Sequence, residues 1–220
     1  MPAGWTGCIT AREKYTGGFQ WALDDTNPTT EPFPFLEPGR FYPPPLDSIL
    51  YGCPEVAITG PTSNVNIITD AMDRMTANGT GRLDASMAWA WRLLSPNWRG
   101  SWGTTNYPTS TTDEAQKKII FVSDGNTEIY TFEMDQTRTW GYNEGSETGF
   151  EHMVDLCTRI KNEGIEIYML KIDGNDRAIP YFQQCASTGD HYYNVSEPEH
   201  IPLVFTDILN GLEAELRLSR

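Results

Sequence analysis

The chain has 220 residues, with 16 Lys and Arg against 30 Asp and Glu, which gives a formal net charge of −14. This length allows one large or two small domains, and 39% hydrophobic and 12% aromatic residues indicate a folded protein rather than a disordered acidic tail. The acidity argues against nucleic acid and anionic membrane partners, which need a concentrated basic face. No apolar run reaches the about 20 residues of a membrane-spanning helix, and no signal-peptide pattern follows Met1. We therefore expect a soluble chain, with any export signal and membrane anchor outside it.

Residues 1–60 form a segment unlike the rest, because ten of the fifteen prolines lie between Pro2 and Pro61. Proline fixes φ and lacks an amide donor, so this segment cannot be mainly helix or central strand. We predict that this segment is a proline-rich, irregular excursion from the domain that is anchored by its aromatic residues. It has at most one short strand, at residues 54–60.

From residue 61 the pattern becomes regular. A helix capped by Ser63 is predicted from apolar residues at a helical spacing, namely Val65, Ile68, Met72 and Met75. A second helix is predicted over residues 82–94, followed by a polar loop over 96–117. The continuous apolar run 119–122 suits a strand buried on both faces, and a loop follows it to about residue 145.

The C-terminal part alternates helix and strand. A helix that carries Phe150, Met153, Val154, Cys157 and Ile160 ends near Gly164. A strand over 165–170, a short helix over 181–186 and a strand over 191–195 follow. Ser196 to Glu199 match a capping box with proline in the first turn, and the last helix then buries Ile201, Val204, Phe205, Ile208 and Leu212. This alternation predicts βαβ units and an open, mostly parallel, doubly wound α/β sheet over residues 61–220.

Asp124 is the candidate site residue, because the crevice of an open parallel sheet lies beyond the carboxyl ends of its strands. A carboxylate there suits a hard cation such as Mg²⁺, and Thr80, in a glycine-flanked turn before a helix, offers a second oxygen. The alternative is that Asp124 only caps the next turn. His152, His191 and His200 show no zinc-type spacing, and no nucleophile or phosphate-binding motif is present, so nothing here favours an enzyme.

The four cysteines Cys8, Cys53, Cys157 and Cys185 are too scattered for a zinc cluster, which requires close pairs. They allow two disulfides in three connectivities. The alternative is four buried thiols in a cytosolic protein.

Several sequence blocks, taken in order, resemble the von Willebrand factor type A domain of TadG-like pilus-assembly proteins. The most specific block is Met-Ala-Trp-Ala-Trp-Arg-Leu-Leu-Ser-Pro at 87–96; the others lie at 120–127, 156–157 with Lys161, 164–168, 185–187 and 191–193. Residues 5–12 and Cys53-Pro54 are similar to a long insertion of that family. The resemblance implies a bacterial envelope protein on the periplasmic or extracellular side, where thiols are oxidised, and favours pairing Cys8 with Cys53 and Cys157 with Cys185.

The chain departs from that family at its metal-ion-dependent adhesion site. The motif Asp-x-Ser-x-Ser, which ends the family's first central strand, is absent, and Asp84-Ala85-Ser86 falls inside a helical pattern. The metal-binding threonine of the family falls on Gly81, with Thr80 one place earlier, so only Asp124 carries over. The chain is then either a C-terminal fragment that lacks the first strand or a complete, degenerate domain that needs no metal. We favour the fragment, and expect it to self-associate or to take up a strand from a partner.

These patterns predict a non-enzymatic adhesion or assembly module of a TadG-like pilus or envelope protein. We expect it to bind a protein partner at a face formed by Asp124 and the loop 98–107, with Mg²⁺ or another divalent cation only if a site forms. The alternatives are a metal-dependent hydrolase or phosphotransferase that uses Asp124, and a structural envelope domain with a degenerate metal site.

Overall fold

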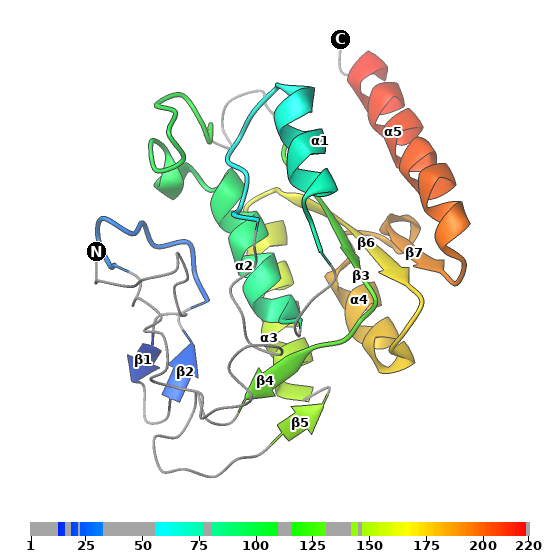
Figure 1. The fold of residues 1–220 in the computed structure, drawn as a ribbon, viewed down its shortest axis with the longest axis horizontal. Helices are drawn as coiled ribbons and strands as arrows, with labels where there is room; N and C mark the ends of the chain where they lie inside the picture. Colours follow the sequence, from blue (N-terminus) through cyan, green and yellow to red (C-terminus); the bar gives the residue numbers. More distant parts are fainter. Residues whose placement is uncertain are drawn as a thin grey trace.

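The computed structural model describes residues 13–15, 19–21, 23–32, 56–76, 81–109, 116–130, 142–144 and 147–218 (Figure 1). Its central sheet consists of three parallel strands in the order β3-β6-β7, namely β3 (Lys118–Ser123), β6 (Glu166–Ile172) and β7 (Tyr192–Val195). The parallel pairing confirms the predicted βαβ organisation.

The burial of the strands reflects their places in the sheet. β6 is the middle strand and is buried from Ile167 to Lys171, as its continuous apolar run requires. β3 buries Ile119 and Phe121, whereas Val122 is 41% exposed. Within the described ranges, no strand pairs with the far edge of β3.

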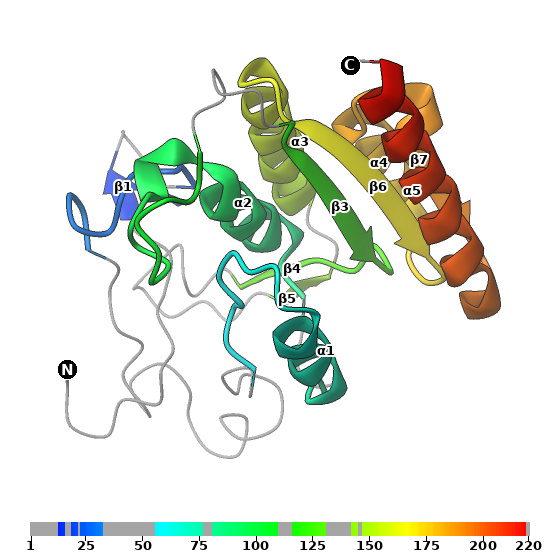
Figure 2. The same cartoon turned by 90° about the horizontal axis from the view of Figure 1, so that it is seen from above.

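Helices cover both faces of the sheet (Figure 2). The larger core lies between one face of the sheet and three helices, α2 (Leu83–Leu94), α3 (Glu147–Asn162) and α4 (Ile179–Cys185). On the other face α5 (Ile201–Leu218) covers Tyr168 and Leu170 with its buried Ile208. The doubly wound α/β prediction is therefore confirmed.

The first predicted helix is present as α1 (Val65–Asp73), but its cap differs. Asn64, not Ser63, is the N-cap, and its side chain accepts a hydrogen bond from the Asn66 amide at 3.1 Å. Ala71 is the only buried residue of α1. The apolar residues whose spacing predicted the helix therefore do not face the core.

Two further elements differ from the sequence prediction. Where one loop was predicted, the short strands β4 (Glu128–Tyr130) and β5 (Tyr142–Glu144) pair antiparallel. The prediction of a capping box over Ser196 to Glu199 is wrong. Glu197 is the N-cap of a 3₁₀ turn there, and its side chain makes no cap hydrogen bond. The remaining short elements are β1 (Glu13–Tyr15), β2 (Phe19–Trp21), η1 (Pro96–Trp98), η3 (Asp176–Ala178), η4 (Gly189–His191) and η5 (Pro198–His200).

The described part of the first sixty residues packs on the α/β body. Leu23 is buried in the larger core, and its carbonyl accepts a hydrogen bond from Arg159 Nη2 at 2.7 Å. The Asp24 carbonyl accepts from Arg92 Nε at 2.8 Å, and the Asp25 carbonyl from Trp98 Nε1 at 2.8 Å. Residues 23–25 are thus tied to α2, α3 and η1, while a domain boundary at residue 60 stays a prediction.

A disulfide joins Cys157 of α3 to Cys185 of α4, with the two Cα atoms 5.1 Å apart. Both side chains are completely buried, so the bond lies inside the larger core. This pairing is the one that the resemblance implied. Cys8 and Cys53 lie outside the described residues. Among the helices of the described ranges, none combines the length and hydrophobicity of a membrane-spanning helix.

Candidate functional site

The loop after β3 carries Asp124 at the carboxyl end of the sheet, where the sequence placed it. The carboxylate accepts from the Asn126 amide at 3.0 Å through Oδ1 and from Asn126 Nδ2 at 2.7 Å through Oδ2. Both oxygens therefore have a partner in the turn, while the side chain itself stays exposed. Asp124 performs the turn-capping that was the alternative interpretation of this residue.

A second loop, after β6, meets this turn directly. The Asp124 carbonyl accepts a hydrogen bond from the Asn175 amide at 2.8 Å. Gly174 has φ +101°, and a Cβ there would lie 2.7 Å from the Asp124 carbonyl oxygen, so no other residue fits without a shift. Gly125 is equally restricted, because its Cβ would lie 2.6 Å from Ala178 Cβ. These contacts join the two loops into one surface, which we call the strand-end face.

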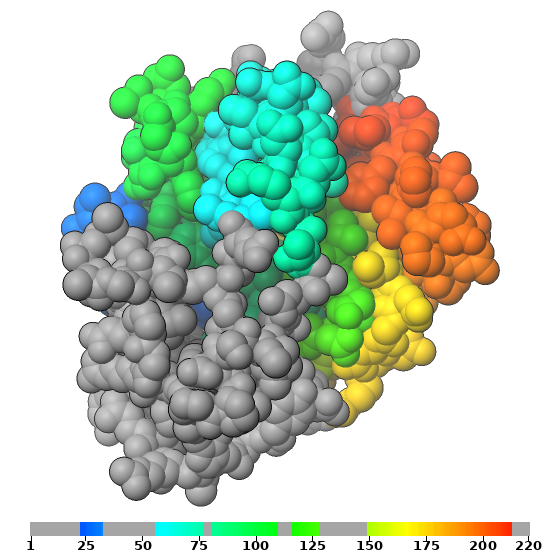
Figure 3. Space-filling model, viewed as in Figure 1, coloured from blue at the N-terminus to red at the C-terminus, as the bar shows by residue number. Residues whose placement is uncertain are grey.

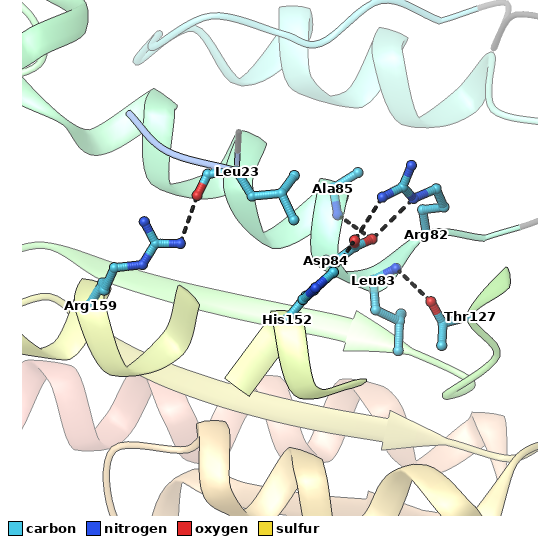
Figure 4. Close-up of polar contacts among 8 residues, drawn as sticks. All are labelled: Leu23, Arg82, Leu83, Asp84, Ala85, Thr127, His152 and Arg159. Carbon is cyan, nitrogen blue, oxygen red and sulfur yellow. Dashed lines mark hydrogen bonds and ion pairs between the residues drawn. The ribbon is translucent and has the colours of Figure 1, made fainter. Parts of the chain in front are cut away.

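The start of α2 is the third part of this region. The Leu83 amide, which has no partner inside the helix, donates to Thr127 Oγ1 at 3.3 Å (Figure 4). Gly81, the position of the family's threonine, lies close by, since a Cβ there would be 3.1 Å from the Asn126 carbonyl oxygen. The structure thus brings Gly81 and the Asp124 loop together, as the resemblance implies. Thr80 lies outside the described residues.

Next to this loop lies a buried charge that sequence reasoning missed (Figure 4). Asp84 is fully buried in the first turn of α2. Its Oδ2 lies 2.7 Å from Arg82 Nη2 and 3.8 Å from His152 Nδ1, and its Oδ1 accepts from Arg82 Nε at 3.1 Å and from the Ala85 amide at 2.7 Å. Burial by itself raises the pKa of this carboxyl, but the neighbouring His152 and Arg82 outweigh burial and hold the pKa below its ordinary value. Asp84 is therefore a charged structural residue that links the starts of α2 and α3.

A sequence signal for Asp84 did exist. Asp84 lies three, four and seven residues before Met87, Ala88 and Trp91, and these three residues are all buried on the inner face of α2. A carboxylate on the apolar face of a helix needs a partner, and the chain supplies Arg82 two residues earlier.

The loop 98–107 lies at the other end of the sheet. α2 begins beside Thr127, which follows β3, whereas its last carbonyl, that of Leu94, accepts from Lys117 Nζ at 2.7 Å, just before β3. α2 therefore runs antiparallel to β3 and delivers the loop to the amino end of the strand (Figure 1). The expectation that this loop and Asp124 form one face is wrong.

The aromatic residues of that loop stabilise the end of α2. Trp98 is buried and stacks on Trp102, with ring centroids 5.3 Å apart, and both contact Trp89 edge to face. The Arg92 guanidinium lies 4.6 Å from the centre of a Trp89 ring. The Trp-rich block that carries the resemblance is thus a packing element of this fold.

No protein-family profile matches the chain, and no curated protein matches it in sequence. Among solved structures, the fold is similar to the vWF domain of the type V pili tip protein Mfa5 from Porphyromonas gingivalis, with a TM-score of 0.51 and 11% identity over 70% of this chain and 74% of that one. The pilus adhesin SpaC from Lactobacillus rhamnosus GG gives a TM-score of 0.48 and 13% identity over 69% of this chain, which spans 21% of SpaC.

The chain has a von Willebrand type A-like fold.

A von Willebrand type A-like fold raises the question of a divalent cation at the strand ends. Among the described residues, the donors do not make up such a site. Both oxygens of Asp124 are engaged by Asn126, glycine stands at the threonine position 81, and within the described ranges no three His, Cys, Asp or Glu side chains converge on one point. Cation binding by Asp124 with Thr80 stays a prediction.

We expect Mg²⁺, Mn²⁺ and Ca²⁺ to bind no tighter than about 1 mM, because Asp124 and Thr80 together would supply few of the six to eight oxygens that such ions prefer. Titration calorimetry of the full chain, with melting temperature as a second measurement, checks this. Asp124→Ala removes the candidate carboxylate, and Asp155→Ala, on the exposed side of α3, is the matched control. Micromolar binding, or binding that survives in Asp124→Ala, would contradict the expectation.

Proposed function

We propose that this chain is a non-enzymatic adhesion or assembly module of a pilus or cell-envelope protein of the TadG-like type. The observation that carries the proposal is the von Willebrand type A-like fold. This fold is similar to that of the vWF domain of Mfa5, which is a pili tip protein. The ordered sequence blocks between residues 87 and 193 support the same family. A binding module also fits Asp124, whose exposed carboxylate is engaged in its own turn rather than held in the low-dielectric surroundings usual for a catalytic acid.

The disulfide supports a location outside the cytoplasm. Cys157 and Cys185 are completely buried and bonded, and structural disulfides form and persist in oxidising compartments. We therefore place the module in the periplasm or at the cell exterior.

The partner surface that we propose is the strand-end face. Three carboxylates are exposed on its two loops, those of Asp124, Asp173 and Asp176. Asp176 forms an ion pair with Lys171 Nζ at 2.9 Å. A partner protein that presents Lys, Arg or amide donors would complement this acidic surface.

Photo-crosslinking in the source bacterium tests the proposal. A photoreactive residue in place of Asp173 should form adducts with a pilus or envelope protein, identified by mass spectrometry. The same residue in place of the exposed Asp155 on α3 is the control and should not form them. Adducts with cytoplasmic proteins only, or none at position 173 in cells that assemble the pilus, would refute the proposal.

A further inference from the structure

A short segment of the first sixty residues is held on the α/β body through its backbone. Three side chains of α2, α3 and η1 donate hydrogen bonds to its successive carbonyls at positions 23, 24 and 25, namely Arg159 Nη2 at 2.7 Å, Arg92 Nε at 2.8 Å and Trp98 Nε1 at 2.8 Å. Figure 4 shows the first of these contacts. Every amino acid has a main-chain carbonyl, so these donors hold a peptide backbone and give affinity without selecting a sequence. We call residues 23–25 the strap.

Two side chains of the strap supply the selectivity. Leu23 is only 6% exposed and lies in the larger core. The Asp25 carboxylate accepts from Asn97 Nδ2 at 2.7 Å and from the Ser95 hydroxyl. The body thus contacts a leucine and, two residues later, a carboxylate. Two of its three backbone donors are arginines, so its charge complements an acidic segment of the pattern Leu-x-Asp.

The strap lies at the edge of the body and is neither helix nor strand. Figure 3 shows residues of the segment 23–32 at the surface in blue, next to the residues that follow α2, in green; there Asn27 Nδ2 donates to the Asn97 carbonyl at 2.6 Å. Because side chains of the body supply these hydrogen bonds, the strap can leave without breaking a helix or the sheet. Segments of this kind open locally at a smaller cost in free energy than global unfolding.

We propose that the surface under the strap is a peptide-binding site, which the strap fills in the single chain and a partner protein fills with a segment of the pattern Leu-x-Asp. The strap supports this occupant, because it shows which backbone and side-chain groups the site holds and that the site accepts acidic residues. The partner segment competes with the strap, so its apparent affinity falls with the fraction of chains in which the strap is closed. This inference is independent of the proposed function.

Fluorescence anisotropy with a labelled peptide of residues 21–32 tests the proposal. The full chain with Leu23→Ser has a weakened strap and should bind the peptide. The native chain should bind it at least about tenfold more weakly, because its own strap competes at a high effective concentration. Adding Arg159→Met to the Leu23→Ser chain should weaken binding about tenfold, since it removes one charged donor to the backbone. Methionine keeps an apolar side chain over Trp91, where the guanidinium lies 5.4 Å from the ring.

Two altered peptides are the controls. The peptide with Leu23→Asp should not bind, whereas the peptide with Thr30→Ala, which changes an exposed side chain, should bind like the native one. A peptide with a photoreactive leucine at position 23 gives a second measurement that needs no weakened strap. At about 1 mM, where even weak binding shows, it should form adducts with α2 or α3 of the native chain. Absence of these adducts would overturn the proposal, and so would equal binding of the native and Leu23→Asp peptides.

Discussion

Replacing Asp84 with alanine is expected to destabilise the folded chain by about 3–5 kcal/mol, the usual cost of removing one partner from a buried ion pair. The substitution leaves Arg82 without this carboxylate and removes the acceptor of the Ala85 amide at the start of α2. It also removes the negative charge from the first turn, where it interacts favourably with the helix dipole. Urea denaturation followed by circular dichroism measures the change.

Asp155→Ala is the control for this prediction. Asp155 also pairs with an arginine, Arg159, but its side chain is 70% exposed, so we expect a loss of no more than about 0.5 kcal/mol. Nearly equal losses of unfolding free energy in the two variants would contradict the prediction, because they would show that the contacts of Asp84 do not stabilise the fold more than an exposed ion pair does.

The same carboxylate makes stability depend on pH. The pKa of Asp84 is lower in the folded chain than in the unfolded one, so the folded state favours the ionised form. The stabilisation is fully present above the ordinary pKa of about 4 and is lost as the pH falls through the lower folded value. The gap in unfolding free energy between the native sequence and Asp84→Ala should therefore narrow as the pH drops from 5 toward about 2. A gap that stays constant over this range would contradict the assigned pKa direction.

The elements that the sequence predicted well are those decided by local pattern. The short apolar runs of β3 and β6 favour strands, and the helical spacing in α2 and α3 extends over 12 and 16 residues. The short strands β4 and β5 were missed because three residues each carry no usable periodicity, and their pairing depends on contacts between distant segments.

The strand-end face was predictable only in part. The position of Asp124 follows from its strand, but Thr127 reaches the Leu83 amide across 44 residues, and such a cap has no local signature. The misplacement of the loop 98–107 was avoidable. A loop that directly precedes a strand must approach its amino end, whereas Asp124 follows the carboxyl end of the same strand.

α1 shows why amphipathic spacing alone does not predict burial. Val65, Ile68, Met72 and Met75 follow the helical repeat, and the helix forms, yet all four are exposed. The pattern identifies a face that needs a partner, and it cannot say whether that partner is the core of the same chain. Here the described core leaves these four side chains uncovered.

Removing the disulfide is the other change with a large expected effect. Cys157→Ala with Cys185→Ala should cost about 3–4 kcal/mol, because the bond closes a loop of 28 residues whose freedom in the unfolded chain it restricts. Paired alanines keep two small apolar side chains in the larger core, so lost packing is a smaller part of the cost. Chemical denaturation of the oxidised native chain and the double variant gives the difference.

Lys161→Met is the matched control, because Lys161 also holds α3 to the end of α4. Its Nζ donates to the carbonyls of Gln184 at 2.7 Å and Ala186 at 3.3 Å, and losing these hydrogen bonds should cost only about 1 kcal/mol. If the unfolding free energy of the double cysteine variant lies within about 1 kcal/mol of that of the native chain, the prediction is contradicted. The disulfide would then stabilise the fold no more than these hydrogen bonds do. A cost near 3 kcal/mol would instead be a large share of the stability of a typical domain. The fold would then depend on an oxidising compartment, which is where the proposed function places it.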